Sequence, residues 1–413
     1  MEISPRKIIK KKCKTCGKYR QHSKKDSSHC VHCNESLQVL TGNKLVDNLI
    51  KKSLTLKVKN KMTYIPFEQF TNIEYIAEGG FSKIYKAVWE DGPITGWSEK
   101  KGCFRRRKRE IVLKRLNNSE NIDSSFLNEL EAYIKIVGKE SNPFVRGSRG
   151  GGSGYQSRIN NLFGITQDPQ TRDFMLVIDF VKDGDLHHFL LNHNEIDSFS
   201  KLSILENTAK QLMKIHNQKI IHRDFHSGNI LIHKLSAGVS VNINDFGISR
   251  PASESSDKEV YGVIPYIAPE ILREEKFTTA SDIYSFGMIM WEITSGQKPF
   301  SDRSHDIHLI IDICNGIRPP IINDTPQPFV DLMMKCWEND PSKRPTADMI
   351  YRFINGMHKI ELPTIKNTKF ATHPQAVFTS RPLSTLIRTA SALQYTQLNC
   401  LSFAGEEYFV NKL

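Results

Sequence analysis

The sequence has no long hydrophobic run. No stretch of its 413 residues approaches the roughly 20 consecutive apolar residues that a membrane-spanning helix needs. Its first residues lead into Lys10-Lys11-Lys12, where a secretory signal peptide would need an apolar segment. We therefore expect neither secretion nor membrane insertion, and we expect a cytoplasmic protein, with the nucleus as the alternative location.

Acidic residues are in short supply relative to basic ones. The chain has 45 Asp and Glu against 57 Lys and Arg, a net charge of +12. This excess favours polyanionic partners such as ATP, acidic proteins or nucleic acid, although a solvated basic surface is the simpler interpretation. Apolar content of 39% and charged content of 25% are those of ordinary globular proteins. The length allows a catalytic domain of about 250 to 300 residues plus extra segments.

Cysteines are few, but four of the eight lie close together near the N-terminus. They form two CxxC pairs separated by 13 residues: Cys13, Cys16, Cys30 and Cys33. Two such pairs can place four thiolates around one Zn²⁺ ion, which would supply folding energy that a short segment with little apolar core lacks. Free thiols or a redox pair are the alternative, and His29 or His32 could replace one ligand. We therefore predict a zinc-binding module over residues 1–40, followed by a helical linker over 41–69.

The central motif of the chain is His222-Arg223-Asp224-Phe225-His226-Ser227-Gly228-Asn229. An acid and an amide five positions apart in one loop can serve the two ends of a phosphoryl transfer. Asp245-Phe246-Gly247 starts 21 residues after Asp224, and Ala268-Pro269-Glu270 closes the following segment. Over residues 70 to 360 or so, the chain thus resembles a eukaryotic protein kinase, most closely the tyrosine-kinase-like serine/threonine group and its fungal members.

The resemblance implies an α+β, two-lobed protein kinase fold after the zinc-ribbon-like module. A small antiparallel β-lobe with one helix would cover residues 70–180, and a larger, mainly helical lobe would cover 181–362. Residues 363–413 contain scattered Ser, Thr and Pro with weak periodicity, which is typical of a disordered tail. A Gly- and Ser-rich stretch around 146–154 predicts a mobile loop within the small lobe.

The nucleotide-binding residues are assigned by the same resemblance. The glycine-rich loop departs from the kinase pattern, since Ala77 and Ser82 replace two glycines and only Gly79 is kept, which questions the affinity for nucleotide. Lys114 ends an apolar strand and would position the phosphates. The expected ATP-contacting set is Ala77, Glu78, Gly79, Gly80, Phe81, Ser82, Ile84, Lys114, Asp179, Val181, Asn229 and Asp245.

An acidic partner for Lys114 is expected on the helix that follows. Helical spacing puts Glu129 on the same face as Phe126 and Tyr133, whereas Glu131 projects to the opposite side. We therefore predict an ion pair between Lys114 and Glu129, with Glu131 as the alternative partner. The resemblance also implies that Arg344 pairs with Glu270 and that Asp282 accepts hydrogen bonds from the catalytic-loop backbone.

The implied activity is transfer of the ATP γ-phosphoryl group to a hydroxyl of a protein substrate. Asp224 would orient the hydroxyl and accept its proton, and Asn229 and Asp245 would ligate Mg²⁺. Serine/threonine specificity is our interpretation, although His226 and Val263 replace the usual lysine and threonine. A pseudokinase scaffold, a dual-specificity or tyrosine kinase, and a nucleic-acid-binding protein are the alternatives. The oligomeric state is left open.

Two further expectations concern charged segments. Arg223 precedes the catalytic acid and could bind a phosphate carried by Ser253, Ser255 or Ser256, which would order the activation segment. The basic run Arg105-Arg106-Arg107-Lys108-Arg109 is interpreted as a solvated loop, with a nuclear-localisation or nucleic-acid patch as the alternative.

Overall fold

A computed structural model gives the fold as two compact units, which are described separately below. Unit 1 comprises Met1–Gly154 and Asn160–Phe180, and unit 2 comprises Tyr155–Ile159 and Val181–Leu413. The structure describes residues 11–12, 19–20, 41–55, 62–79, 82–98, 103–116, 124–138, 162–193, 196–235, 238–251, 259–357, 359–365 and 371–396. The Gly- and Ser-rich stretch at 146–154 lies outside these residues. Within them, no helix combines the length and apolar character that crossing a membrane requires.

Unit 1 is built on a six-stranded sheet with the order β3-β9-β10-β8-β5-β4. Only the edge strand β3 pairs in parallel, with β9, and the other neighbours are antiparallel. The strands are β3 (Thr63–Tyr64), β4 (Phe70–Glu78), β5 (Ser82–Trp89), β8 (Arg109–Leu116), β9 (Leu162–Gln167) and β10 (Phe174–Asp179). A small antiparallel β-lobe was predicted, and the described sheet has this form except for the parallel pairing of β3 with β9.

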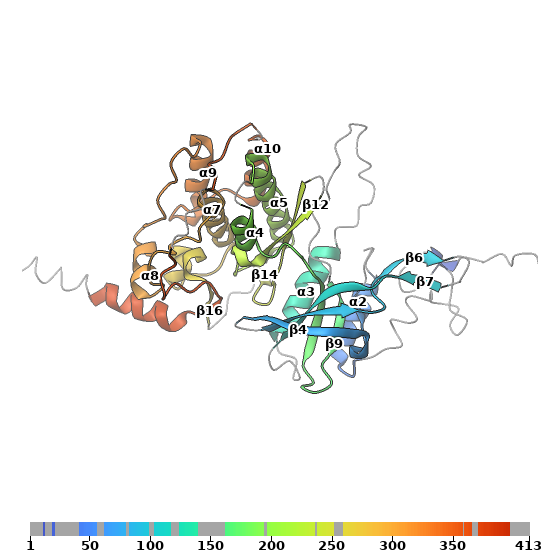
Figure 1. The fold of residues 1–413 in the computed structure, drawn as a ribbon. Coiled ribbons are helices and arrows are strands. Elements are labelled where there is room, and N and C mark those ends of the chain that lie inside the picture. The colour runs from blue at the N-terminus through green and yellow to red at the C-terminus, as the bar shows by residue number, and fades with distance from the viewer. Residues whose placement is uncertain are drawn as a thin grey trace, which may run out of the picture. The chain divides into compact units, whose positions relative to one another are not determined.

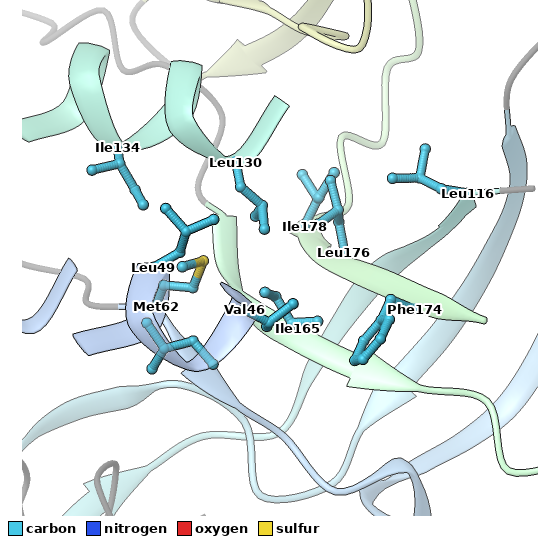
Figure 2. Close-up of a cluster of buried hydrophobic side chains, with 11 residues drawn as sticks. Val46, Leu49, Met62, Leu116, Leu130, Ile134, Ile165, Phe174, Leu176 and Ile178 are labelled. Atoms are coloured by element: carbon cyan, nitrogen blue, oxygen red, sulfur yellow. The ribbon is translucent and has the colours of Figure 1, made fainter. Parts of the chain in front are cut away.

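Two helices pack on this sheet, α2 (Lys44–Thr55) and α3 (Ser124–Gly138), as Figure 1 shows. Val46 and Leu49 of α2 are buried with Leu130 of α3 and Ile165 and Leu176 of the sheet (Figure 2). The expected linker helix is therefore part of the core of unit 1, and the one helix predicted for residues 70–180 is α3. The spacing of apolar residues predicted the helix. It did not predict which residues the helix packs against, because lysines lie among its few apolar residues.

The basic run is also more ordered than the expected solvated loop. Part of it belongs to β7 (Cys103–Arg106), which pairs with β6 (Ile94–Ser98) in a separate two-stranded sheet. Arg109 begins β8 and forms a bidentate ion pair with Asp179, both distances being 2.7 Å. Asp179, expected at the adenine-binding hinge, thus has a structural partner on the neighbouring strand.

Unit 2 is mainly helical. Its buried central helix is α7 (Thr279–Ser295), in which every residue from Ser281 to Thr294 is buried. The others are α4 (Leu186–Asn192), α5 (Ser198–Asn217), α6 (Pro269–Leu272), α8 (Ile307–Cys314), α9 (Gln327–Cys336) and α10 (Ala347–Asn355). Unit 2 also contains short antiparallel strand pairs. β11 (Ile220–Ile221) pairs with β14 (Arg250–Pro251), and β12 (Ile230–Leu235) pairs with β13 (Gly238–Ile243).

The described residues after Leu362 differ from the expected disordered tail. Arg381–Pro382 form strand β16, which pairs with β15 (Tyr261–Gly262), and residues 384–396 are helical. Leu383, Ile387 and Ala390 are at most 2% exposed, so this helix packs an apolar face. The spacing of these three residues was a helical signal among the Ser and Thr residues that suggested disorder.

Candidate functional site

The Lys114 ammonium is held by a carboxylate inside unit 1. Lys114 Nζ donates to Oε1 and Oε2 of Glu129 at 2.9 and 3.1 Å, and both side chains are nearly inaccessible to solvent. The predicted ion pair is therefore present. Glu131, the alternative partner, forms an exposed pair with Lys135 one helical turn later. A buried charge pair of this kind fixes one ammonium group at the centre of the sheet, where Lys114 lies between Ile84 and Leu176.

The glycine-rich turn of unit 1 is described in part. Ala77 and Glu78 end β4, Ser82 and Ile84 lie in β5, and Gly79 N donates to Ser82 O at 2.8 Å. Gly80 and Phe81 lie outside the described residues. Two paired strands therefore flank the turn, as the sequence predicted.

The loop that contains Asp224 is held by hydrogen bonds to Asp282 of α7. Asp282 accepts hydrogen bonds from the backbone N–H groups of His222 and Arg223, at 2.9 and 3.0 Å, as predicted. His216 Nε2 adds a third contact at 2.8 Å. The loop can therefore hold Arg223 at φ 71°, a left-handed conformation that costs energy unless the surroundings impose it.

The two proposed metal ligands are joined to the loop by hydrogen bonds. Asn229 Nδ2 donates to Asp224 O at 2.8 Å, and Asn244 N donates to Asn229 O at 2.9 Å. Asp245 has φ 62°, and Gly247 N donates to its Oδ1 at 3.2 Å. Unit 2 therefore ties the Asn229 side chain to the backbone of Asp224 and, through Asn244, ties the backbone next to Asp245 to Asn229.

His222 links the loop to the segment of Asp245. Its ring lies 5.6 Å from that of Phe225 and 5.3 Å from that of Phe246, centroid to centroid, and Nε2 bonds to Asn244 O at 2.9 Å. Burial lowers the pKa of His222, with nearby carboxylates acting in the opposite direction. A neutral imidazole donates to that carbonyl. His222 and Phe246 therefore pack against each other.

Comparison with known proteins identifies this arrangement. Residues 152–354 match the family model described as protein tyrosine and serine/threonine kinase. This part of the chain is therefore similar to protein kinase domains. A probable serine/threonine-protein kinase of Dictyostelium discoideum is 25% identical over 73% of this chain, and mitogen-activated protein kinase kinase kinase 10 of Xenopus laevis is 27% identical over 69%. Serine/threonine-protein kinase VIK of Arabidopsis thaliana is 24% identical over 75%. The chain spans only 20%, 26% and 63% of the lengths of these three relatives.

Unit 2 places an imidazole beside Asp224, the predicted catalytic acid. His226 Nδ1 accepts a hydrogen bond from Gly228 N at 3.1 Å, and Nε2 lies 3.6 Å from Asp224 Oδ1. Since Nδ1 is the acceptor, the ring carries its proton on Nε2 and turns that N–H toward the carboxylate. The sequence flagged His226 only as a departure from the usual lysine. Its contact with Asp224 was not anticipated.

A buried carboxylate behind the loop was also missed. Glu292 of α7 is fully buried, accepts from Tyr266 Oη at 2.7 Å and lies 2.8 Å from His187 Nδ1. Tyr266 Oη also lies 3.2 Å from Ser227 Oγ. Burial raises the pKa of Tyr266, and Glu292 adds to the effect. A glutamate at the end of an otherwise apolar helix was the signal that could have revealed this network.

The end of the activation segment is fixed by an ion pair. Arg344 donates to both carboxylate oxygens of Glu270 at 2.7 Å, and this side-chain pair is almost fully buried. The prediction of this bridge is confirmed. The phosphate acceptors Ser253, Ser255 and Ser256 and the four N-terminal cysteines lie outside the described residues.

Proposed function

We propose that this chain is an ATP-dependent protein kinase that phosphorylates serine and threonine residues of protein substrates. The buried ion pair between Lys114 and Glu129 carries this proposal, because a scaffold that has lost catalysis has no need to hold a phosphate-binding lysine in this way. The names of the three relatives, all of them kinases, support the same activity. The name of the Xenopus relative supports the tyrosine-kinase-like group, and a relation to the fungal members of that group stays a prediction.

Each residue then has a defined task in phosphoryl transfer. Lys114 would position the nucleotide phosphates, and Asp224 would orient the incoming hydroxyl and accept its proton. The amide oxygen of Asn229 and the carboxylate of Asp245 are hard oxygen donors that suit Mg²⁺. When bound, Mg²⁺ would neutralise charge on the phosphate oxygens. Asp179 and Val181 would flank adenine, and the residues of the glycine-rich turn would cover the phosphates.

The residue beside the proposed catalytic acid, His226, bears on whether the substrate hydroxyl belongs to serine and threonine or to tyrosine. Many serine/threonine kinases carry a lysine at the position of His226, and here the His226 N–H faces Asp224 instead. We retain serine/threonine specificity as the proposal, with dual specificity or tyrosine specificity as the alternatives. Docking of an activation-segment phosphate on Arg223 stays a prediction.

The proposed activity can be tested with purified protein, Mg-ATP and a mixture of protein substrates. We expect phosphoserine and phosphothreonine in the products, and Asp224→Asn should lower turnover at least about 100-fold, as removal of a general base does. Phosphotyrosine as the main product would overturn the specificity. Equal phosphate incorporation by wild-type and Asp224→Asn protein would instead support the scaffold alternative.

We also propose that the N-terminal cysteines bind zinc. Cys13 and Cys16 lie in the sequence between β1 (Lys11–Lys12) and β2 (Tyr19–Arg20), and these strands pair in antiparallel register. A CxxC pair that lies in the sequence between two paired strands supports a zinc knuckle, for which Cys30 and Cys33 would supply the other two thiolates.

A further inference from the structure

The imidazole of His226 is folded back onto its own loop. His226 caps the 3-10 helix η2 (Ser227–Asn229), and its Nδ1 accepts a hydrogen bond from Gly228 N at 3.1 Å. Its ring lies 5.9 Å from the Tyr266 ring, centroid to centroid. His226 is only 9% exposed, so these contacts hold the ring in one place. Because a ring nitrogen that accepts carries no hydrogen, the hydrogen of this imidazole is on Nε2.

The same ring limits which residue can occupy position 228. A Cβ atom built on Gly228 would lie 2.9 Å from His226 Cε1 and 3.0 Å from its Nδ1. Apart from the two chain neighbours and the backbone of its own helix, no other described atom lies within 4 Å of that Cβ. The backbone of Gly228 has no positive φ, so an L side chain is not strained there. An alanine would therefore displace the imidazole, which can rotate, and leave the loop in place.

The other nitrogen of the ring faces the proposed catalytic acid. His226 Nε2 lies 3.6 Å from Asp224 Oδ1, an electrostatic contact that is longer than a hydrogen bond. Gly262 approaches the same oxygen, since a Cβ atom built on it would lie 3.8 Å from Oδ1. The two side chains are 11% and 10% exposed, and an N–H dipole acts more strongly on a carboxylate where little water reaches it. Both contacts fall on Oδ1, which leaves Oδ2 for other groups.

A lysine at position 226 could not take this arrangement. An ammonium group has three donors and no acceptor, so it cannot accept from Gly228 N as Nδ1 does. The imidazole binds its own backbone with one nitrogen and faces Asp224 with the other. His226 and Gly228 therefore form one unit, because the missing side chain at 228 provides the space for the ring.

We propose that His226 is a positioning residue for Asp224 and that Gly228 is required for it to act. This inference rests on the proposed kinase activity. The Nε2–H group attracts Oδ1 and fixes the rotation of the carboxylate, so that Oδ2 receives the proton of the substrate hydroxyl. The hydroxyl oxygen forms a bond to the γ-phosphorus of ATP, the bond to the β,γ-bridging oxygen breaks, and ADP leaves with the electron pair. His226 neither gains nor loses a proton in this step.

The first test compares kcat and KM of full-length variants with Mg-ATP and myelin basic protein. His226→Ala should lower kcat by about 10- to 100-fold, as a misplaced catalytic group does, and leave the KM for ATP unchanged. His226→Gln, whose amide has both an acceptor and donors, should retain more activity than His226→Ala. His233→Ala is the control and should match wild type, because the His233 side chain is 45% exposed and lies 3.9 Å from a different acid, Asp183.

A double-mutant cycle tests the role of Gly228. Gly228→Ala should lower kcat about as much as His226→Ala, whereas the combined variant should lose no more than His226→Ala alone, since its alanine at 228 meets no ring. Gly356→Ala is the matched control, because Gly356 is helical and its new Cβ would make only ordinary contacts. Losses that multiply in the combined variant would mean that the two residues act independently, and would overturn the coupling.

Nitrogen-15 NMR of the His226 ring, assigned by its loss in His226→Gln, gives a readout that does not depend on turnover. We expect the hydrogen on Nε2 in the wild type, and a hydrogen on Nδ1 would overturn the proposal. Thermal unfolding shows whether each variant is folded. Wild-type kcat in folded His226→Ala would overturn the positioning role and leave the kinase assignment intact. No phosphate transfer by the wild type, as for Asp224→Asn, would overturn both.

Discussion

Among single residues, the choice of Glu129 over Glu131 shows that helical spacing alone can identify the ion-pair partner of Lys114. Both glutamates lie on α3, two positions apart, which rotates one of them about 200° from the other around a helix of 3.6 residues per turn. Glu129 is buried against Lys114, and Glu131 is partly exposed beside Lys135. The helical period therefore decided the correct partner before any fold was known.

This difference predicts contrasting effects on stability. Glu129→Ala leaves the Lys114 ammonium buried without its carboxylate, which should lower the free energy of unfolding of unit 1 by about 3–5 kcal/mol. Glu131→Ala removes only an exposed pair and should change it by about 0.5 kcal/mol or less. Urea unfolding, followed by amide hydrogen exchange in the sheet, measures both. Equal stability of the two variants would contradict the buried pair.

Other residue-scale features required the fold. Arg109 and Asp179 are 70 positions apart in the sequence and meet because β8 and β10 are neighbours. The Nε2–H of His226 turns toward Asp224 because Gly228 N occupies its other nitrogen. No local pattern encodes such contacts, since each depends on a backbone conformation elsewhere.

At the level of elements, the sequence did not predict that α2 and the tail pack against a core. Each has apolar residues at helical spacing among many polar ones, a pattern that is also common in exposed segments. Val46, Leu49 and Ile50 are buried because α3 and β9 cover them, and Leu383 and Ile387 are buried against unit 2. Whether a weakly amphipathic segment folds depends on the surface that receives it.

The anchoring of the tail predicts a response to pH. Burial lowers the pKa of His305, and the charges of Arg381 and Arg303 act in the same direction, whereas its bonds to Val377 and Phe300 raise it. The unfolded state binds a proton more readily, near pH 6.5. The contribution of neutral His305 to stability is therefore complete above pH 6.5 and is lost as the pH falls below it.

Hydrogen exchange of residues 371–396, corrected for intrinsic rates, measures this effect between pH 7 and pH 5. We expect tail protection to fall on acidification, and His305→Gln should show less change with pH. His188→Gln, at an exposed position, is the control and should behave as wild type. Tail protection that does not vary with pH in the wild type would contradict the prediction.

For the whole molecule, the zinc prediction implies that residues 1–40 unfold independently of the kinase domain. Structural zinc supplies on the order of 10 kcal/mol to small modules, and the kinase domain has its own core. Removal of zinc by a chelator should unfold residues 1–40 and leave the thermal transition of the kinase domain unchanged. Native mass spectrometry checks the premise. A native mass without one zinc atom would argue against the site, and loss of both transitions would argue against independence.

The sequence by itself determined the local chemistry and the order of the kinase motifs. The choice of Glu129 as the partner of Lys114 follows from helical spacing. The expected roles of Asp224, Asn229, Asp245, Asp282 and Glu270 follow from the resemblance of short motifs to those of protein kinases. Only the tertiary structure decided that α2 belongs to a core, that Glu292 organises Tyr266 and His187, and that the tail lies beside Gly262. These contacts join positions up to about 120 residues apart, and burial at such distances is a property of the complete fold.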